Sequence, residues 1–202
     1  MGVYSTKSSW QRALRSVVAF CVRKNVPPDA FTFGAMAVSL AAGFAFPLAE
    51  AQRAWLWVIP PCTLIRLLFN LMDGLLARER GLADTWGEVK NEFGDRIEDA
   101  LFFLGLGFSS YVDIRLATLA LALILLVSYL GIFGKALTGK RVYVGVFAKG
   151  DRMLSLGGFT LYAMLSGNLA SYDWYLGFAC FAALITIVQR LRTIHHDTQP
   201  PA

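Results

Sequence analysis

The sequence predicts an all-α integral membrane protein with six transmembrane helices and an N-terminal amphipathic helix at the membrane surface. Composition points in this direction, because 56% of the 202 residues are hydrophobic and only 16% are charged, whereas a soluble domain has about a quarter charged residues. Uncharged stretches also reach the roughly 20 residues that a helix needs to cross the hydrocarbon core. Finally, lysine and arginine gather in alternate loops, as the positive-inside rule requires.

Residues 1–28 form the predicted interfacial segment. Between positions 8 and 24, apolar side chains recur at helical spacing with three arginines interspersed. Such a helix suits the surface of an anionic leaflet. Prolines at positions 27 and 28 end it, and Asp29 can cap the helix that follows. The segment has no early apolar core with a small-residue cleavage site, which argues against a cleaved signal peptide.

Residues 29–192 make up the predicted six-helix membrane domain. Arg66, Asp73 and Arg78 interrupt the second span, and the first half of the third span is charged. Polar residues at that depth indicate function. The three cysteines lie far apart, in or beside apolar segments, and resemble buried small hydrophobic residues rather than a disulfide framework. The expected spans are 30–49, a second that starts near residue 54, 87–111, 116–134, 153–172 and 174–189, followed by a cytoplasmic tail at 193–202.

The distribution of the 19 lysine and arginine residues predicts the orientation. With the N-terminus and the even-numbered turns on one side, that side holds sixteen of them, the other side holds only Arg53 and Arg115, and Arg66 lies in the membrane. The positive-inside rule therefore places both termini and the charged loops in the cytoplasm. The net charge of +5 is mostly this topology signal. No nucleic-acid-binding motif accompanies it, so nucleic acid is not an expected partner.

Polar residues recur at fixed spacing on the second and third predicted helices. On the second, Asn70, Asp73 and Ala77 share one face at positions i, i+3 and i+7. An antiparallel pair of these helices would bring two polar stripes together near the membrane surface. Hard divalent cations prefer the carboxylate and amide oxygens that would meet there. The stripe on the third helix, at steps of four, consists of Gly87, Asn91, Asp95 and Asp99.

This run resembles the signature of the CDP-alcohol phosphotransferase family, also called CDP-alcohol phosphatidyltransferases, in every spacing. The signature is Asp-x-x-Asp-Gly-x-x-Ala-Arg, eight residues, then Gly-x-x-x-Asp-x-x-x-Asp. Asn70 and Asn91 stand at its first and third aspartates, as in a divergent bacterial branch of the family. The six-helix layout and the N-terminal helix extend the resemblance over most of the chain. The matching residues are Asp73, Gly74, Ala77, Arg78, Gly87 and Asp95.

The resemblance implies an enzyme of phospholipid biosynthesis that moves a phosphatidyl-type group from a CDP-linked lipid, such as CDP-diacylglycerol, to an alcohol with release of CMP. It implies Mg²⁺ or Mn²⁺ as cofactor and a homodimer. It also implies the bacterial cytoplasmic membrane, with the active site toward the cytoplasm. By position, Asp95 would be the catalytic base. Asn70, Asp73, Asn91 and Asp95 would be the metal ligands, and Gly74, Ala77, Arg78 and Gly87 would line the CDP pocket.

The two amides remove two negative charges from a site for two dications. Because Mg²⁺ usually favours carboxylate ligands, the number of metal ions is open. Asp99, Glu92 and Glu88 lie within about a helical turn of the motif and can compensate, although a solvated helix end explains them equally well. Arg66 is expected to neutralise either Asp73 or Asp99.

Two other functions remain open from the sequence. One is a catalytically silent relative that binds a CDP-lipid, and the other is a small membrane transporter whose ion path Arg66, Asp73 and Asp95 would line. No inverted repeat supports the transporter. The motif does not encode the acceptor alcohol, because similar cores serve several alcohols. A basic stretch before the fifth span is expected either to hold an anionic acceptor or to serve as a topology signal and headgroup contact. It comprises Lys135, Lys140, Arg141, Lys149 and Arg152.

Overall fold

The computed structural model describes residues 14–199, and every regular element within this range is a helix, so the all-α prediction is confirmed. A short helix, α2 (Arg15–Arg23), precedes six long ones. Two 3₁₀ turns, η2 (Arg53–Val58) and η3 (Leu169–Ser171), lead directly into α4 and α8. The long helices are α3 (Asp29–Leu48), α4 (Ile59–Glu79), α5 (Thr85–Gly107), α6 (Ile114–Thr138), α7 (Lys149–Ser166) and α8 (Tyr172–Asp197).

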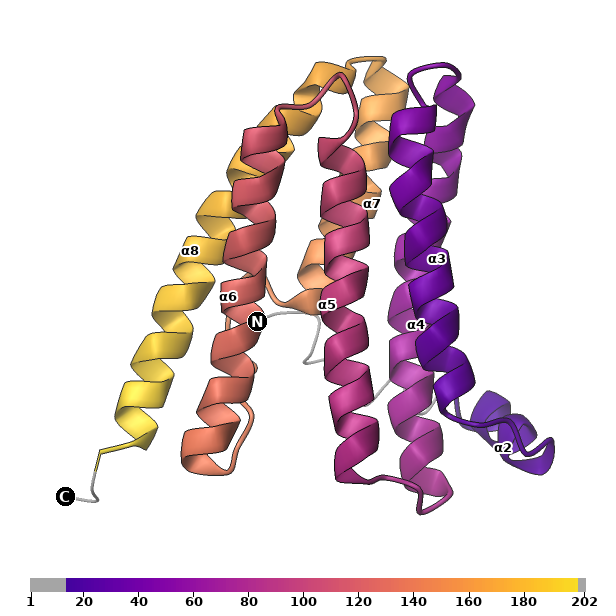
Figure 1. Ribbon diagram of the computed structural model, residues 1–202, viewed down its shortest axis with the longest axis vertical. Helices are drawn as coiled ribbons and strands as arrows, with labels where there is room; N and C mark the ends of the chain where they lie inside the picture. The colour runs from indigo at the N-terminus through magenta and orange to yellow at the C-terminus, as the bar shows by residue number, and fades with distance from the viewer. Residues whose placement is uncertain (1–13, 200–202) are drawn as a thin grey trace.

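The six long helices run side by side, and successive connections alternate between the two ends of the bundle (Figure 1). α3 packs against α4 and α5, α4 packs against α7, and α6 packs against α5 and α8. α2 lies beside α4, at the end that also holds the turn between α4 and α5 and the C-terminal end of α8. The C-terminal half of α4 and the N-terminal half of α5, which carry the motif, therefore belong to this end.

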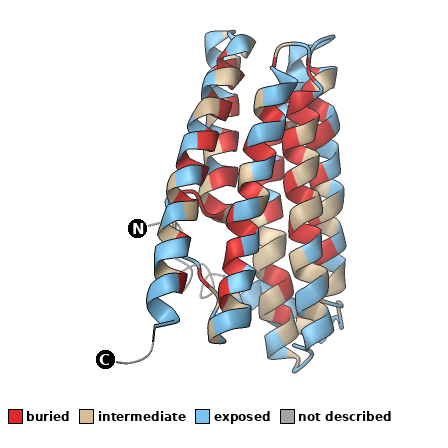
Figure 2. Cartoon of the chain, turned by 60° about the vertical axis from the view of Figure 1, so that its left-hand side comes forward, coloured by how far each residue is buried: buried red, intermediate tan, exposed pale blue. Residues whose placement is uncertain are grey.

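Four of the described helical units are long and apolar enough to cross a membrane: α3, η2 with α4, α6, and η3 with α8. α5 and α7 run alongside them (Figure 1), and the N-terminal half of α5 is rich in charged residues. Figure 2 shows buried residues mainly where helices meet, while large hydrophobic side chains such as Trp174 (83% exposed) lie outside. Lipid would cover an apolar surface of this extent. These features support an integral membrane protein, and the count of six spans stays a prediction.

Close backbone contact and aromatic packing hold the bundle together. Gly105 of α5 lies so near Gly43 of α3 that a Cβ on Gly105 would overlap the Gly43 backbone, and small residues permit this approach in membrane bundles. Tyr172 is completely buried and meets the Phe46 ring edge-on, with 5.9 Å between ring centroids. In the turn after α5, the Tyr111 hydroxyl donates to the Phe46 carbonyl (2.8 Å).

Several helix boundaries differ from the predicted ones. α7 ends at Ser166 rather than at residue 172, because Gly167 adopts a left-handed conformation (φ 69°) that ends the helix. α8 continues to Asp197, so the predicted tail at 193–202 begins inside a helix. Of the predicted interfacial helix at 8–24, the structure describes α2, whose buried side chains pack against α4, and the residues before position 14 lie outside the described part. The three cysteines are free and buried, as expected.

The connection between α6 and α7, residues 139–148, folds back along the bundle (Figure 1), and Val142, Phe147 and Ala148 of this segment are buried. The Phe147 N–H donates to Thr186 Oγ1 on α8 (3.0 Å). Arg190, one turn further along α8, donates through Nε to the Val144 carbonyl (3.0 Å). These bonds give partners to backbone groups inside the bundle, where an unpaired group is costly. The start of α7 is thereby held in the interior of the bundle.

Candidate active site

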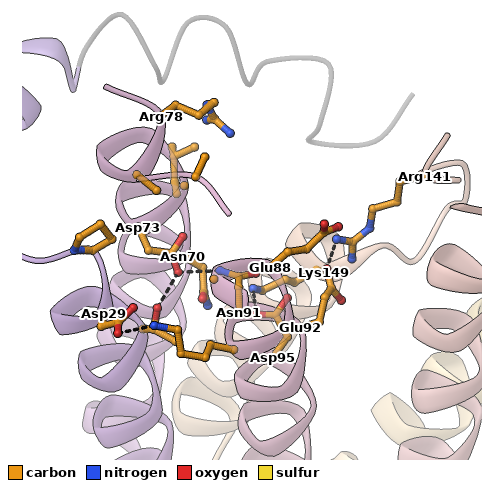
Figure 3. A pocket seen from close by; sticks show the side chains of 18 of the residues that line it. Asp29, Asn70, Asp73, Arg78, Glu88, Asn91, Glu92, Asp95, Arg141 and Lys149 are labelled. Carbon is orange, nitrogen blue, oxygen red and sulfur yellow. Dashed lines mark hydrogen bonds and ion pairs between the residues drawn. The ribbon is translucent and has the colours of Figure 1, made fainter. Parts of the chain in front are cut away.

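A cavity of about 920 Å³ opens at the end of the bundle that holds the α4–α5 turn (Figure 3). We call its two sides the motif wall and the basic wall. All eight residues of the signature line this one pocket and form the motif wall: Asn70, Asp73, Gly74, Ala77, Arg78, Gly87, Asn91 and Asp95. The basic wall consists of Arg141, Lys149, Arg152 and Arg190.

Asp73 lies on α4 and its side chain is almost completely buried. Its Oδ2 accepts hydrogen bonds from Thr32 Oγ1 (3.2 Å) and Asn91 Nδ2 (2.6 Å) (Figure 3). Its Oδ1 is buried and has no hydrogen-bond partner. Both partners of Asp73 are neutral, and a buried carboxylate is costly unless a cation pairs with it or it binds a metal. The environment of Asp73 therefore favours a bound cation.

Asn70 lies one helical turn before Asp73 on the same face of α4. Its Nδ2 donates to Glu98 Oε2 on α5 (2.8 Å). Its Oδ1 is buried and without a partner, like Asp73 Oδ1. α4 thus holds two buried, unpartnered oxygens, one amide and one carboxylate, one turn apart.

Asp95 connects the two walls of the pocket. It forms an ion pair with Lys149, the first residue of α7, and a longer one with Arg96 (3.5 Å). Because Lys149 belongs to the basic wall, this pair ties α5 to α7 across the pocket (Figure 3). Asp95 therefore has a charged partner within the protein, in contrast to Asp73.

Four buried charged residues form a network next to the pocket. Arg66 donates through Nε to Glu98 (2.6 Å) and through Nη2 to Asp99 (2.8 Å), and Arg152 donates to the other Asp99 oxygen (2.9 Å). Two positive and two negative charges balance, as buried ion pairs require. Of the two expected partners of Arg66, the structure selects Asp99 and not Asp73. Asp99 is committed to this network and does not line the pocket, so it is not placed to compensate for the amides.

Glu88 and Glu92, the other carboxylates expected near the site, line the pocket but have basic partners. Glu88 pairs with Lys135 at the end of α6. Glu92 pairs with Arg141 and with Arg96 (3.3 Å). These pairs balance both charges and join α5 to the opposite side of the pocket.

The two motif glycines have different surroundings. A Cβ on Gly74 would have the Arg78 guanidinium as its nearest neighbour, at 3.6 Å, so packing within the protein does not require glycine there. The space above Gly74 belongs to the pocket. A Cβ on Gly87 would lie 2.9 Å from Asp84 Oδ1, which caps α5 by accepting from the Gly87 N–H (2.6 Å). Gly87 therefore also serves the start of α5.

The donor atoms fit a hard divalent cation. The unpartnered oxygens of Asn70 and Asp73 are amide and carboxylate atoms, the ligand types that Mg²⁺ and Mn²⁺ take. Within residues 14–199, no group of three or more His, Cys, Asp or Glu side chains is arranged to hold a metal. Amide oxygens, substrate phosphates and water would therefore supply much of the coordination.

Sequence reasoning missed three residues that shape the site: Thr32, Glu98 and Arg190. Thr32 reaches Asp73 from another helix, and no periodicity links the two positions. Glu98 follows Asp95 by three positions, so the shared helix face was an available signal. Arg190 holds the 139–148 segment, and its signal was a charge at the end of an apolar run.

Relatives match over nearly the full chain, although no family model matches it. The chain is 30% identical over 195 residues to the inner membrane protein YnbA of Escherichia coli K12, covering 96% of each chain. It is 28% identical to the archaetidylinositol phosphate synthase of Aeropyrum pernix, covering 95% of each. It is 25% identical to the phosphatidylinositol phosphate synthase of Mycobacteroides abscessus, covering 98% of this chain and 89% of that one.

Solved structures share the fold. The crystal structure of the Mycobacterium tuberculosis phosphatidylinositol phosphate synthase with CDP-DAG bound has a TM-score of 0.74 at 23% identity, covering 95% of this chain and 99% of the other. The same synthase in complex with manganese and citrate gives 0.72 at 23% identity, covering 93% and 92%. Fold and full-length similarity define a class of helical membrane proteins related to phosphatidylinositol phosphate and archaetidylinositol phosphate synthases. The chain belongs to the CDP-alcohol phosphatidyltransferase family.

Proposed function

We propose that the protein transfers a phosphatidyl-type group from CDP-diacylglycerol to an alcohol acceptor and releases CMP, as a step of phospholipid biosynthesis. One observation carries the proposal: all eight signature residues line a single pocket, where Asn70 and Asp73 hold buried oxygens without protein partners. The related synthases support the reaction class. The structural neighbour with CDP-DAG bound supports the donor.

Asn70, Asp73, Asn91 and Asp95 are the proposed ligands of Mg²⁺ or Mn²⁺. A bound dication would neutralise the oxygens of the reacting and leaving phosphates. The neighbour in complex with manganese supports a divalent metal. Asp73 contributes the one signature carboxylate whose hydrogen-bond partners are all neutral, so we expect it to be the strongest of these ligands.

Asp95 is the proposed base. In the proposed transfer, the acceptor oxygen bonds to the phosphorus that carries the diacylglycerol, the bond from this phosphorus to the CMP oxygen breaks, and the acceptor proton passes to an Asp95 carboxylate oxygen. A positioned carboxylate suits this proton transfer. Lys149 holds Asp95 in place at the pocket. Gly74, Ala77, Arg78 and Gly87 are the proposed lining of the CDP site.

The proposed location is the bacterial cytoplasmic membrane, with six spans, the pocket toward the cytoplasm and a homodimeric assembly. The name of the relative YnbA and the apolar helices support a membrane location. The positive-inside count supports the orientation. Reporter fusions at Ala202 and near Asp113 should report opposite sides of the membrane, and a common side for both contradicts this topology. Crosslinking in the membrane measures the assembly, and a monomer throughout contradicts the homodimer.

Metal-dependent release of CMP from CDP-diacylglycerol by the purified protein tests the function. We expect CMP only when Mg²⁺ or Mn²⁺ and a mixture of candidate alcohols are present, with loss of the signal in EDTA. CDP-diacylglycerol binding without CMP release would identify a catalytically silent relative. Absence of both CDP-diacylglycerol binding and CMP release would favour the transporter. Lipid mass spectrometry of cells with and without the protein then identifies the acceptor from the missing product.

A further inference from the structure

The orientation of the Asn70 amide follows from its partner. Nδ2 and Oδ1 of an asparagine are hard to distinguish by shape, so the hydrogen-bond network must decide which atom points where. The partner here is Glu98 Oε2, at 2.8 Å. Because an ionised carboxylate only accepts hydrogen bonds, the amide must turn its NH₂ group toward Glu98. Its carbonyl oxygen then points away from Glu98, and it is the oxygen that remains buried without a partner.

Glu98 itself is fixed. Its side chain is completely buried, and the same Oε2 accepts from Arg66 Nε at 2.6 Å. Arg66 is also bound to Asp99, and rotation of Glu98 would break its bonds to both Arg66 and Asn70 on α4. Glu98 is therefore fixed by its ion pair with Arg66 and in turn orients the Asn70 amide.

The residue types at positions 70 and 98 depend on each other. An aspartate at position 70, as the family signature has it, would place a second carboxylate within hydrogen-bond distance of Glu98 in a buried setting, where like charges repel strongly. An asparagine at 70 removes this repulsion and gains a hydrogen bond. The signature specifies nothing at position 98. With an amide instead of a carboxylate at position 70 on α4, the negative charge can be carried by Glu98 on the neighbouring helix α5.

We propose that Glu98 is a positioning residue that allows asparagine to serve at position 70, and this rests on the proposed function. Glu98 directs the amide oxygen of Asn70 toward the cation. Its carboxylate also polarises the amide and balances the Arg66 guanidinium, which would otherwise repel a dication. Residues that hydrogen-bond to a metal ligand in this way typically contribute about 10–100-fold to metal affinity.

A charge exchange between the two positions tests the proposal. Mn²⁺ affinity is measured by the electron paramagnetic resonance signal of free Mn²⁺, and thermal unfolding is followed in detergent with EDTA. Glu98→Gln should weaken Mn²⁺ binding by about 10–100-fold. Asn70→Asp should lower the unfolding temperature of the metal-free protein, because two carboxylates meet. The double variant Asn70→Asp/Glu98→Gln should restore both the Mn²⁺ affinity and the unfolding temperature. The amide introduced at position 98 can donate to the carboxylate introduced at position 70 and accept from Arg66.

Two further variants separate this proposal from the proposed function. Glu79→Gln removes one carboxylate from an exposed position at the end of α4 and should leave Mn²⁺ affinity unchanged. Asp73→Asn should abolish Mn²⁺ binding, and persistent tight binding there would overturn the metal site itself. If Asp73→Asn loses Mn²⁺ while Glu98→Gln binds it normally, the metal site stands and the role of Glu98 is wrong. A double variant no better than the sum of its singles would also overturn the role, because coupled sites must be non-additive.

Discussion

The two walls of the pocket are built in different ways. The motif wall stands on two successive helices, where Asp73 meets Asn91 and Asn70 meets Glu98 across the α4–α5 pair. The basic wall draws its cations from the 139–148 segment, the first turn of α7 and the C-terminal half of α8. Local helix periodicity therefore builds the first wall, whereas the second exists only after distant parts of the chain have packed together. The same pocket thus depends on two kinds of sequence information.

Replacing a carboxylate of the motif wall should have the largest effect. Asp73→Asn and Asp95→Asn each remove a charge that the proposed transfer uses, and we expect CMP release to fall by about 100-fold or more, on the order of 3 kcal/mol of barrier. Asp113→Asn is the matched control, because Asp113 caps α6 at the other end of the bundle and asparagine caps a helix equally well. A wild-type rate in the Asp73→Asn/Asp95→Asn double variant would contradict this site.

The packing of the basic wall is tested by a substitution that its backbone conformation does not accommodate. Gly145 has a φ of 143°, and a Cβ there would overlap the Thr186 side chain. Gly145→Ala should therefore reduce the free energy of unfolding by about 1–3 kcal/mol, seen as a lower melting temperature in detergent. Gly158→Ala in α7 is the control, because a Cβ there meets nothing within 4 Å. Equal melting of both variants would show that the packing of the 139–148 segment contributes little to stability.

Gly74→Ala should separate ligand binding from stability on the motif wall. The added methyl group would meet only the Arg78 guanidinium, at an ordinary contact distance of 3.6 Å, so the melting temperature should not fall. It fills space above α4 that the proposed CDP-lipid needs, and we expect binding of CDP-diacylglycerol to weaken by about tenfold, as one misplaced methyl group typically costs. Gly177→Ala, on the apolar part of α8 with open space around its Cβ, is the control. Unchanged CDP-diacylglycerol binding would place the ligand away from Gly74.

Asn91→Asp should have the smallest effect. It places a carboxylate next to Asp73 Oδ2, which now accepts from Asn91 Nδ2 at 2.6 Å. Without metal the two charges repel, but a dication that contacts both should more than offset this repulsion. We expect the Mg²⁺ or Mn²⁺ concentration for half-maximal CDP-diacylglycerol binding to fall a few fold, while turnover need not rise. A metal titration measures this, and an unchanged midpoint would mean that Asn91 does not contact the cation.

The motif wall could be predicted because spacing fixes which side chains share a helix face. Asn70 and Asp73 share a face of α4, and the short turn of residues 80–84 makes α5 antiparallel to α4. Which residues then meet across the helices could not be predicted. The rotation of each helix about its axis and its position along the bundle decide that Arg66 binds Asp99 and Glu98 rather than Asp73. Residue spacing along the chain does not determine this rotation or position.

The 139–148 segment could not be predicted as part of the bundle. Its basic residues are equally typical of a loop at lipid headgroups. The structural reason for its position lies on α6, where a Cβ on Gly134 would lie 2.5 Å from Val142 Cγ2. In the sequence, Gly134 is only the end of an apolar run, and nothing there indicates that another segment packs on it.

The contact between Gly43 and Gly105 has a mechanical consequence. With no side chains between the two backbones, α3 and α5 have no deformable layer that would let one slide or roll over the other. The motif residues on α5 are thus attached to a stiff support. The exposed pair Lys135–Glu88, which joins the end of α6 to α5, can exchange with water at little cost. In mechanical terms, α5 is held rigidly against α3 and more loosely against the end of α6.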